Sequence, residues 1–211
     1  MPHDLSQAKL YGILDLGYVS TEAAPHTALL LLKSGVDILQ LRAKTSTPTE
    51  VETLARQVIP LAREAKVPFI INDFPEVAAS TGADGVHVGQ DDMQIADVRK
   101  IIGQNKIVGK STHSLAQAIA AQAEGADYIG FGPLFATPTK PGRPAIGTED
   151  IRAAHKAVTN IPIFCIGGVK KENVPELVEA GARRVVIVSG ILQAEDPAEY
   201  TRDVKARLTI V

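Results

Sequence analysis

Short apolar runs alternate with amphipathic segments from one end of the chain to the other. The runs have the length of buried strands, and between them apolar residues recur at helical spacing, as at Leu54, Val58 and Leu61. We expect eight strands, at residues 11–16, 36–41, 69–71, 85–88, 106–109, 128–131, 161–166 and 184–188. Eight strand–helix pairs in 211 residues leave roughly 26 residues per pair, at the compact end for a barrel. The pattern therefore predicts the α/β class and a (β/α)₈ TIM barrel.

The helix boundaries carry recognisable signals. Thr47–Glu50 and Asp196–Glu199 each supply a capping side chain, then a proline, and then the glutamate of a capping box. Pro60 lies inside the helical pattern that follows the first of these segments, so we expect a kink or a break there. Before the second, fourth, sixth and eighth strands a glycine stands where a helix should end, at Gly35, Gly82, Gly125 and Gly181. This repeat favours a closed barrel over an open doubly wound sheet.

Length and charge narrow the class of partner. A chain of 211 residues can bury one sizeable core, so we expect a single domain over residues 1–211. The formal charge of −2 and the scarcity of charge runs argue against nucleic acid and membrane surfaces, which leaves small molecules. Cys165 lies in an apolar run and is expected to be a buried thiol without a catalytic role. Because neither a leader-like segment nor an apolar run of ~18 residues is present, we expect a soluble, cytoplasmic protein.

The segment after the sixth strand is unusually long and shows no periodicity. It runs over residues 132–147 and carries two hydroxyls and a cation, at Thr137, Thr139 and Lys140. In compact domains such a long connection is more often a lid or a binding loop than a passive link. These side chains suit an anionic group, and a solvated surface loop is the alternative.

The second strand ends in polar residues, at the face where barrels of this kind carry their working loops. Gln40, Arg42 and Lys44 alternate, so their side chains point the same way. An arginine fork and a lysine point charge beside a carboxamide suit a phosphate or a pyrophosphate. The alternative is a strand end held by salt bridges.

Acidic residues follow the third and fourth strands. Asn72 and Asp73 end the third strand, and Asp91 and Asp92 follow the fourth. Because neighbouring parallel strands lie about 5 Å apart, Asp73 and one of the other two aspartates can converge on one hard cation. Two carboxylates with substrate oxygens and water are the usual way to hold Mg²⁺. Asp91 could instead cap the next helix, and His87 fits a hydrogen-bonded interior residue better than a metal ligand.

The fifth, seventh and eighth strands end in small residues. Ser111 can donate to an anion, while Ser114 suits the cap of the next helix. Gly168 and Val188-Ser189 follow the last two strands, where such barrels commonly bind phosphate through amide N–H groups. Two anion sites are therefore expected, and one of them is this amide nest. The other is cationic and holds a divalent metal, with Arg42, Lys44, Asp73, Asp92 and Lys140.

Taken in order, these motifs resemble the thiamine-phosphate synthase (thiamine-phosphate pyrophosphorylase) family. The resemblance covers nearly the whole chain, and the ordered set is a strong signal although each motif alone is weak. The motifs are Q-x-R-x-K at 40–44, Asn72-Asp73, D-G-V-H-V-G-Q-D-D at 84–92, G-x-S-x-H at 109–113, G-P-x-F-x-T-x-T-K at 132–140, I-G-G at 166–168 and V-S at 188–189. Two positions depart from the family pattern: Ala43, where many members carry a charged residue, and Gly190, where alanine is usual.

The resemblance implies a condensation of hydroxymethylpyrimidine diphosphate with a thiazole phosphate, giving thiamine phosphate and pyrophosphate. It implies that pyrophosphate leaves first and that the thiazole nitrogen captures a pyrimidine methyl cation. Carried onto this chain, the residues for the pyrimidine diphosphate are Gln40, Arg42, Lys44, Asn72, Ser111 and Lys140. Four of them would be catalytic: Arg42, Lys44, Ser111 and Lys140. Mg²⁺ would be bound by Asp73 and Asp92, and the thiazole phosphate by Thr137, Thr139, Gly168, Val188 and Ser189.

Two rival functions stay open at this point. A thiazole tautomerase of the same fold resembles the synthase but uses acid–base chemistry at a histidine that matches His113. The diphosphate and metal residues argue against it, because a tautomerase releases no diphosphate. The second rival is a non-catalytic paralogue that binds a thiazole or thiamine phosphate, although carboxylates that converge without a cation would repel one another. The sequence leaves a homo-oligomer open.

Overall fold

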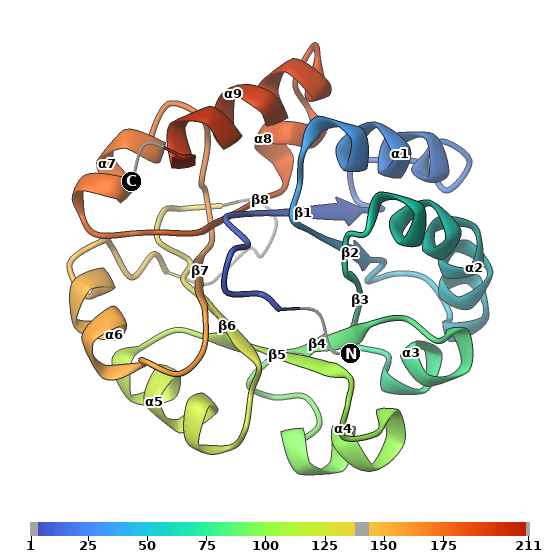
Figure 1. Ribbon diagram of the computed structural model, residues 1–211, viewed down its shortest axis with the longest axis horizontal. Coiled ribbons are helices and arrows are strands. Elements are labelled where there is room, and N and C mark those ends of the chain that lie inside the picture. Colours follow the sequence, from blue (N-terminus) through green and yellow to red (C-terminus); the bar gives the residue numbers. More distant parts are fainter. Residues whose placement is uncertain (1–3, 138–143, 210–211) are drawn as a thin grey trace.

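The chain forms a closed parallel barrel surrounded by helices (Figure 1). The computed structural model describes residues 4–137 and 144–209. Its strands pair in chain order and β8 returns to β1; they are β1 Leu10–Asp15, β2 Ile38–Arg42, β3 Phe69–Asn72, β4 Gly85–Val88, β5 Ile107–Thr112, β6 Tyr128–Phe131, β7 Ile163–Cys165 and β8 Val185–Ile187. The helices of the described residues are α1 Ala24–Ser34, α2 Pro48–Ala65, α3 Pro75–Thr81, α4 Ile95–Ile102, α5 Leu115–Ala123, α6 Ile151–Ala157, α7 Val174–Glu179, α8 Ser189–Leu192 and α9 Pro197–Thr209. The predicted (β/α)₈ barrel is confirmed.

Each predicted strand is present; β7 is three residues shorter than predicted, and β5 extends beyond its predicted end. This strand continues to Thr112, whereas its apolar pattern predicts an end at Gly109. Ser111 and Thr112 pair with Gly130 and Phe131 of β6, and the Thr112 hydroxyl donates to the carbonyl oxygen of Gly130 at 3.0 Å. Because hydrogen bonding satisfies these polar groups, the strand extends beyond its apolar run.

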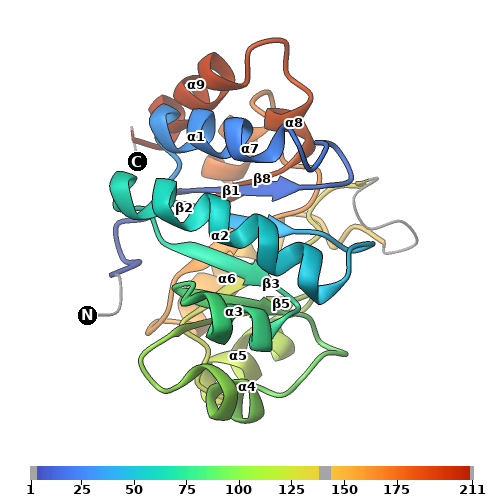
Figure 2. The same ribbon diagram turned by 90° about the vertical axis from the view of Figure 1, so that its right-hand side faces the viewer.

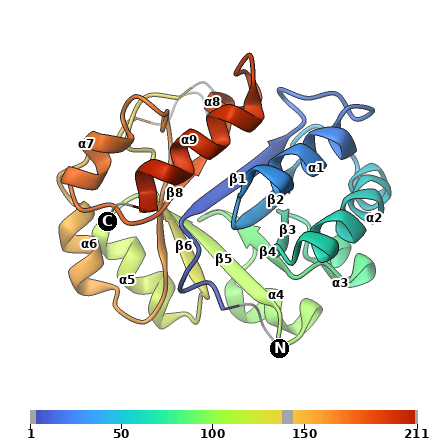
Figure 3. The ribbon, with the colours of Figure 1, turned by 45° about the horizontal axis from the view of Figure 1, so that its top comes forward.

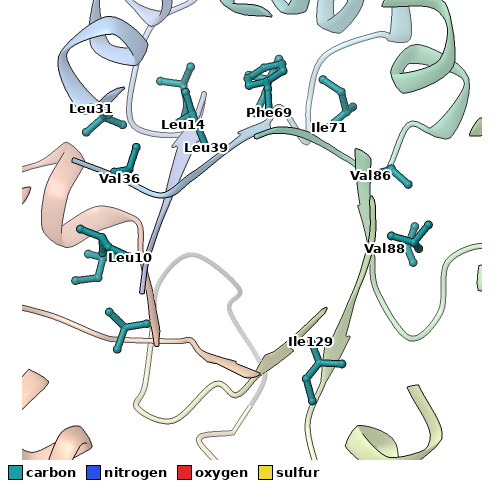
Figure 4. Packing of buried hydrophobic residues seen from close by; sticks show 14 of the residues in the cluster. Leu10, Leu14, Leu31, Val36, Leu39, Phe69, Ile71, Val86, Val88 and Ile129 are labelled. Atoms are coloured by element: carbon teal, nitrogen blue, oxygen red, sulfur yellow. The ribbon is translucent and has the colours of Figure 1, made fainter. Parts of the chain in front are cut away.

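Alternating side chains build two apolar layers. Those that point outward from the strands pack under the helices, as Leu14, Leu39 and Ile71 do in Figure 4. Those that point inward fill the barrel together with two residues of the segment before β1; this inner cluster is Leu5, Ala8, Tyr11, Ile13, Ile38, Ile70, Ile107, Tyr128, Phe164 and Val186. The barrel is thus a packed core rather than a pore, as expected for this fold.

The helices complete a ring around the strands. In the side view of Figure 2 the arrows of β1 and β2 point to the right, which marks the carboxyl end of the barrel. α9 packs beside α1, so the last helix closes the ring on the first (Figure 3). Among the described residues, no helix is long and apolar enough to cross a membrane.

Helix starts follow the predicted capping chemistry. The Thr47 side chain accepts from the backbone N–H of Glu50, whose carboxylate accepts in return from the N–H of Thr47. Asp196 accepts from two backbone N–H groups at the start of α9, each at 2.9 Å. Of the predicted kink or break at Pro60, the break is absent, because α2 continues through this residue. Proline has no backbone N–H, so the carbonyl oxygen one turn before Pro60 lacks its helical partner. Pro60 is exposed, so water can hydrate that oxygen.

The four repeated glycines end their helices as predicted. Their φ angles are 102° at Gly35, 71° at Gly82, 89° at Gly125 and 104° at Gly181. This left-handed conformation is unfavourable for residues with a Cβ, which explains why glycine recurs there.

Cys165 is a buried thiol, as predicted. It ends β7 with 0% of its surface exposed. Burial raises the pKa of the Cys165 thiol to about 12, so the reactive thiolate is scarce at neutral pH.

His155 in α6 makes the fold sensitive to acid. Burial, with the nearby Arg183 and Arg184, lowers the pKa of His155 to about 4. The folded state therefore keeps a neutral imidazole, whereas the unfolded chain takes up a proton below its ordinary pKa of about 6.5. We expect stability to be complete above about pH 6.5 and to fall as the pH drops toward about 4.

The variant His155→Gln isolates this contribution. Urea unfolding of wild type and variant near neutral pH and at about pH 5 should show a smaller acid loss in the variant. An equal loss in both proteins would mean that His155 does not carry the effect.

Candidate active site

A cavity opens at the carboxyl end of the barrel, where the strand ends meet. Its wall contains eight of the predicted site residues: Gln40, Arg42, Asn72, Ser111, Thr137, Gly168, Val188 and Ser189. Deeper side chains such as Tyr11, Ile13 and Val186 belong to the inner cluster of the barrel. The working loops therefore converge on one site, as the strand-end argument predicts.

Arg42 lies on the cavity wall and is held by a partner that the sequence analysis missed. Its Nη1 is 2.6 Å from Oδ2 of Asp15, which lies beside it in the β1–β2 register. The second oxygen of Asp15 accepts from the backbone N–H of Gly17 at 2.9 Å. The side chains of Arg42 and Asp15 are only 13% and 2% exposed. Arg42 is therefore both a salt-bridged strand end and an oriented cation at the cavity.

Lys44 and Asp73 form an ion pair at the ends of β2 and β3. Asp73 has a φ of 65°, in the left-handed region, and its N–H donates to the carbonyl oxygen of His87 at 2.9 Å. This backbone turn places the Asp73 carboxylate beside Lys44, which follows the neighbouring strand β2. The pair is outside the cavity wall proper, with Lys44 48% exposed.

Asp92 lies in the exposed turn after β4. Its Oδ2 accepts from the backbone N–H of Gly89 at 2.6 Å. The interpretation of Asp91 as a helix cap is wrong, because Gln94 occupies the cap position of α4. β3 and β4 are neighbours in the sheet, so Asp73 and Asp92 follow adjacent strands.

A polar chain lies deeper in the cavity wall. His87 contacts the Tyr128 hydroxyl through Nδ1 at 3.0 Å and the Ser111 hydroxyl through Nε2 at 2.9 Å. The Tyr128 hydroxyl in turn lies 2.8 Å from that of Tyr11. The prediction of a hydrogen-bonded interior role for His87 is therefore confirmed. The two tyrosines were missed, because a tyrosine in an apolar strand gives no sign of where its hydroxyl points.

The turns after β6 and β7 pack against each other at the other side of the cavity. The N–H of Leu134 donates to Ile166 O at 2.9 Å, and that of Phe135 donates to Gly167 O at 3.0 Å. Gly168 has a φ of 66°, and a Cβ there would lie 2.7 Å from Cβ of Phe135. Only glycine allows this close contact between the two turns.

Side chains from neighbouring elements contact the turns that carry Gly168 and Ser189. Asn173 donates to the carbonyl oxygen of Gly168 at 3.0 Å, a contact without a sequence signal. Val188 occupies the cap position of α8, and Ser189 begins this helix. Gly190 replaces the usual alanine where a Cβ would lie 2.9 Å from the Tyr200 hydroxyl, which accounts for that departure.

The remaining predicted residues divide into three groups. Ser114 caps α5 by accepting from Gln117 N, as predicted. His113 lines the cavity, and its Nδ1 donates to the carbonyl oxygen of Gly132. Thr139 and Lys140 lie outside the described residues.

Chemically, the lining of the cavity suits anionic groups. Arg42 of β2 lines the cavity with a fixed positive charge, and Asn72 of β3 and Ser111 of β5 line it with polar groups. Gly168 and Ser189 line it after β7 and β8, where backbone amides can bind an anion. Apolar side chains such as Ile13 and Val186 complete the lining.

The sequence and the fold were compared with known proteins. The thiamine-phosphate synthase of Thermus thermophilus is 42% identical over 189 residues, which cover 90% of this chain and 91% of that protein. The thiamine-phosphate synthase of Chloroflexus aurantiacus is 38% identical over 205 residues, which cover 96% and 93%. The solved thiamine phosphate pyrophosphorylase of Pyrococcus furiosus has a TM-score of 0.85 and 31% identity over 96% of both chains.

Family membership follows from the extent of these matches. A 3-hexulose-6-phosphate synthase structure, with a TM-score of 0.69 at 21% identity, shares the fold alone. A family model described as thiamine monophosphate synthase matches residues 10–191. The chain therefore belongs to the thiamine monophosphate synthase family and is an enzyme of that family.

Proposed function

We propose that the protein condenses hydroxymethylpyrimidine diphosphate with a thiazole phosphate and releases thiamine phosphate and pyrophosphate. The observation that carries this proposal is the convergence of Arg42, Asn72 and Ser111 with Gly168 and Ser189 on one cavity. The first three suit a diphosphate, and the last two suit a monophosphate. Apolar side chains of the same wall, such as Ile13 and Val186, can contact the heterocycles.

In this proposal pyrophosphate leaves before the thiazole nitrogen attacks. Negative charge then grows on the leaving oxygens, so the useful groups are fixed donors and cations rather than a nucleophile. Arg42 is fixed by Asp15, and Ser111 by His87. Lys44 and Lys140 would add positive charge from the rim and from the loop after β6. Gln40 and Asn72 would orient the pyrimidine diphosphate, and Thr137, Thr139 and Val188 would contact the thiazole phosphate.

Mg²⁺ belongs to the proposal, and the donor set fits it. Asp73 and Asp92 offer hard carboxylate oxygens from adjacent strand ends. Across residues 4–137 and 144–209, no group of three or more His, Cys, Asp or Glu side chains could hold a metal by itself. The remaining ligands would therefore be phosphate oxygens and water, which is how Mg²⁺ is commonly bound. When bound, the ion would neutralise charge on the diphosphate.

Tautomerisation of a thiazole phosphate is the second candidate activity, and His113 is the observation that favours it. Its ring lines the cavity, with Nδ1 committed to the Gly132 carbonyl. One assay separates the candidates: the protein is incubated with both heterocyclic phosphates, with and without Mg²⁺. Coupling with pyrophosphate release supports the synthase, and isomerisation without coupling supports the tautomerase. Binding without turnover supports a non-catalytic paralogue, and it would refute the proposal.

Gly168→Ala tests the proposed monophosphate end. The added Cβ would meet Phe135, and the positive φ would be strained, so the amides would move. We expect KM for the thiazole phosphate to rise about tenfold or more, as for one lost charge-assisted hydrogen bond. KM for the pyrimidine diphosphate should change little. Equal increases in both KM values would contradict the assignment of the two ends.

A further inference from the structure

Five polar side chains form a continuous hydrogen-bonded chain across the barrel interior. Gln40 Nε2 lies 2.7 Å from the Tyr11 hydroxyl, which lies 2.8 Å from the Tyr128 hydroxyl. The chain continues through His87, whose Nδ1 is 3.0 Å from Tyr128 and whose Nε2 is 2.9 Å from Ser111 Oγ. These residues come from β2, β1, β6, β4 and β5, and each lines the cavity.

The direction of this chain follows from its first member. The amide nitrogen of Gln40 can only donate, so the Tyr11 oxygen accepts that bond. Among the described side chains that bond to the Tyr11 hydroxyl, Tyr128 is then the one that can receive its proton. Tyr128 accepts from Tyr11 and has its own proton left for Nδ1 of His87.

The same donor–acceptor argument fixes the direction of the hydrogen bond between His87 and Ser111, at the other end of the chain. A neutral imidazole whose Nδ1 accepts carries its proton on Nε2. Nε2 of His87 therefore donates to Ser111 Oγ. The Ser111 proton is consequently directed away from His87, toward the cavity that the serine lines.

Burial makes this order hard to change. Tyr11 and Tyr128 are each 1% exposed and Gln40 is 2% exposed, so a reversed link would leave a buried donor or acceptor unsatisfied. Burial also raises the pKa of both tyrosines above the ordinary value, and the neighbouring Tyr11 raises that of Tyr128 further. Both phenols therefore stay protonated and can donate.

Packing holds the rings in place. Tyr11, Tyr128 and Phe164 contact each other edge to face, with ring centroids 5.5 to 5.7 Å apart. Gly109 of β5 lies opposite Tyr128, and a Cβ there would come within 2.4 Å of its hydroxyl oxygen. The glycine makes room for the tyrosine to reach both of its partners.

We propose that Gln40, through Tyr11 and Tyr128, is a positioning residue that sets the tautomer of His87 and thereby turns the Ser111 hydroxyl into a hydrogen-bond donor toward the substrate. This role rests on the proposed function in one respect only: the proposed function identifies the acceptor of the Ser111 hydrogen bond as the anionic leaving group. The contact between Ser111 and His87 has the spacing of a nucleophile and its base. The order of the chain excludes that use, because Nε2 carries a proton and cannot take one from serine.

The tautomer can be measured directly, without substrate. In two-bond ¹H–¹⁵N spectra of the full chain labelled on histidine, the His87 signals are identified by their loss in His87→Asn. We expect one neutral tautomer with the proton on Nε2. His113 is an internal reference of the opposite kind, because its Nδ1 donates to the Gly132 carbonyl.

Substitutions of Gln40 test the direction in which the hydrogen bonds of the chain donate. Gln40→Glu, measured at about pH 8 where a glutamate is normally ionised, presents an acceptor to Tyr11 and should move the His87 proton to Nδ1. Gln40→Met removes the donor and should give a mixture of both tautomers, while the His113 signals stay unchanged. A wild-type proton on Nδ1, or an unchanged His87 in both variants, would overturn the proposal. If neither variant folds, Tyr128→Phe should also release the single tautomer, and its persistence would refute the chain.

Kinetics supply an independent test. Gln40→Met and Tyr11→Phe should each lower kcat on the order of tenfold, less than removal of a transition-state donor outright. Because both break one chain, the double variant should be no slower than the slower single variant. Additive losses in the double variant would mean that Gln40 and Tyr11 do not act through one hydrogen-bonded chain. If the enzyme has no condensation activity, the tautomer result still stands, so failure of the two proposals can be told apart.

Discussion

Replacing either Asp73 or Asp92 with asparagine is expected to lower kcat/KM for condensation on the order of a hundredfold or more. Each substitution removes one of the two carboxylates proposed for Mg²⁺ and keeps the size of the side chain. Asparagine also tolerates the left-handed conformation that Asp73 adopts at φ 65°, so the turn after β3 should persist. The measurement is the initial rate of pyrophosphate release as a function of Mg²⁺ concentration.

The control for these variants is Asp97→Asn. Asp97 pairs with Lys100 on the surface of α4, and such exposed pairs contribute little to stability. We expect wild-type turnover and an unchanged Mg²⁺ dependence in this control. Binding of Mn²⁺ in place of Mg²⁺, followed by its paramagnetic signal, should weaken in the two site variants alone. Full activity in Asp73→Asn or in Asp92→Asn would refute the metal assignment.

Replacing Arg42 with methionine is expected to reduce both stability and turnover. Asp15 is 2% exposed at its side chain, and removal of its partner leaves a buried carboxylate without a counter-charge. Such losses cost about 3–5 kcal/mol in the free energy of unfolding. The variant also lacks the fixed cation at the cavity, so kcat should fall on the order of a hundredfold. Urea unfolding and steady-state kinetics measure the two effects separately.

A second substitution separates the structural role of Arg42 from its role at the cavity. In Asp15→Asn/Arg42→Met the buried charge is gone, so most of the lost stability should return. Turnover should stay low, because the cation is still missing. If turnover also returns, Arg42 acts only by stabilising the fold. The single variant Asp15→Asn should keep much of the activity, because Arg42 remains.

The barrel itself could be predicted because its signals are local. Strands such as β4 and β6 match their predicted bounds at both ends, since a buried parallel strand is marked by a short apolar run between turn residues. β5 was predicted too short because Lys110 and Thr112 interrupt the apolar run. Lys110 is 3% exposed and pairs with Glu124 at 3.4 Å. That partner comes from a different element, so the strand sequence alone does not reveal it.

The sequence alone determined the fold class, the face that carries the site and eight of the residues on its wall, because strand periodicity and strand-end position are properties of the chain itself. The tertiary structure decided which groups are paired and in which direction they donate. Asp15 became the partner of Arg42 only through the register of β1 and β2. Tyr11 and Tyr128 are 117 positions apart in the chain, and closure of the barrel brings their hydroxyls together. Hydrogen-bond direction depends on such contacts between distant strands, and no local pattern encodes it.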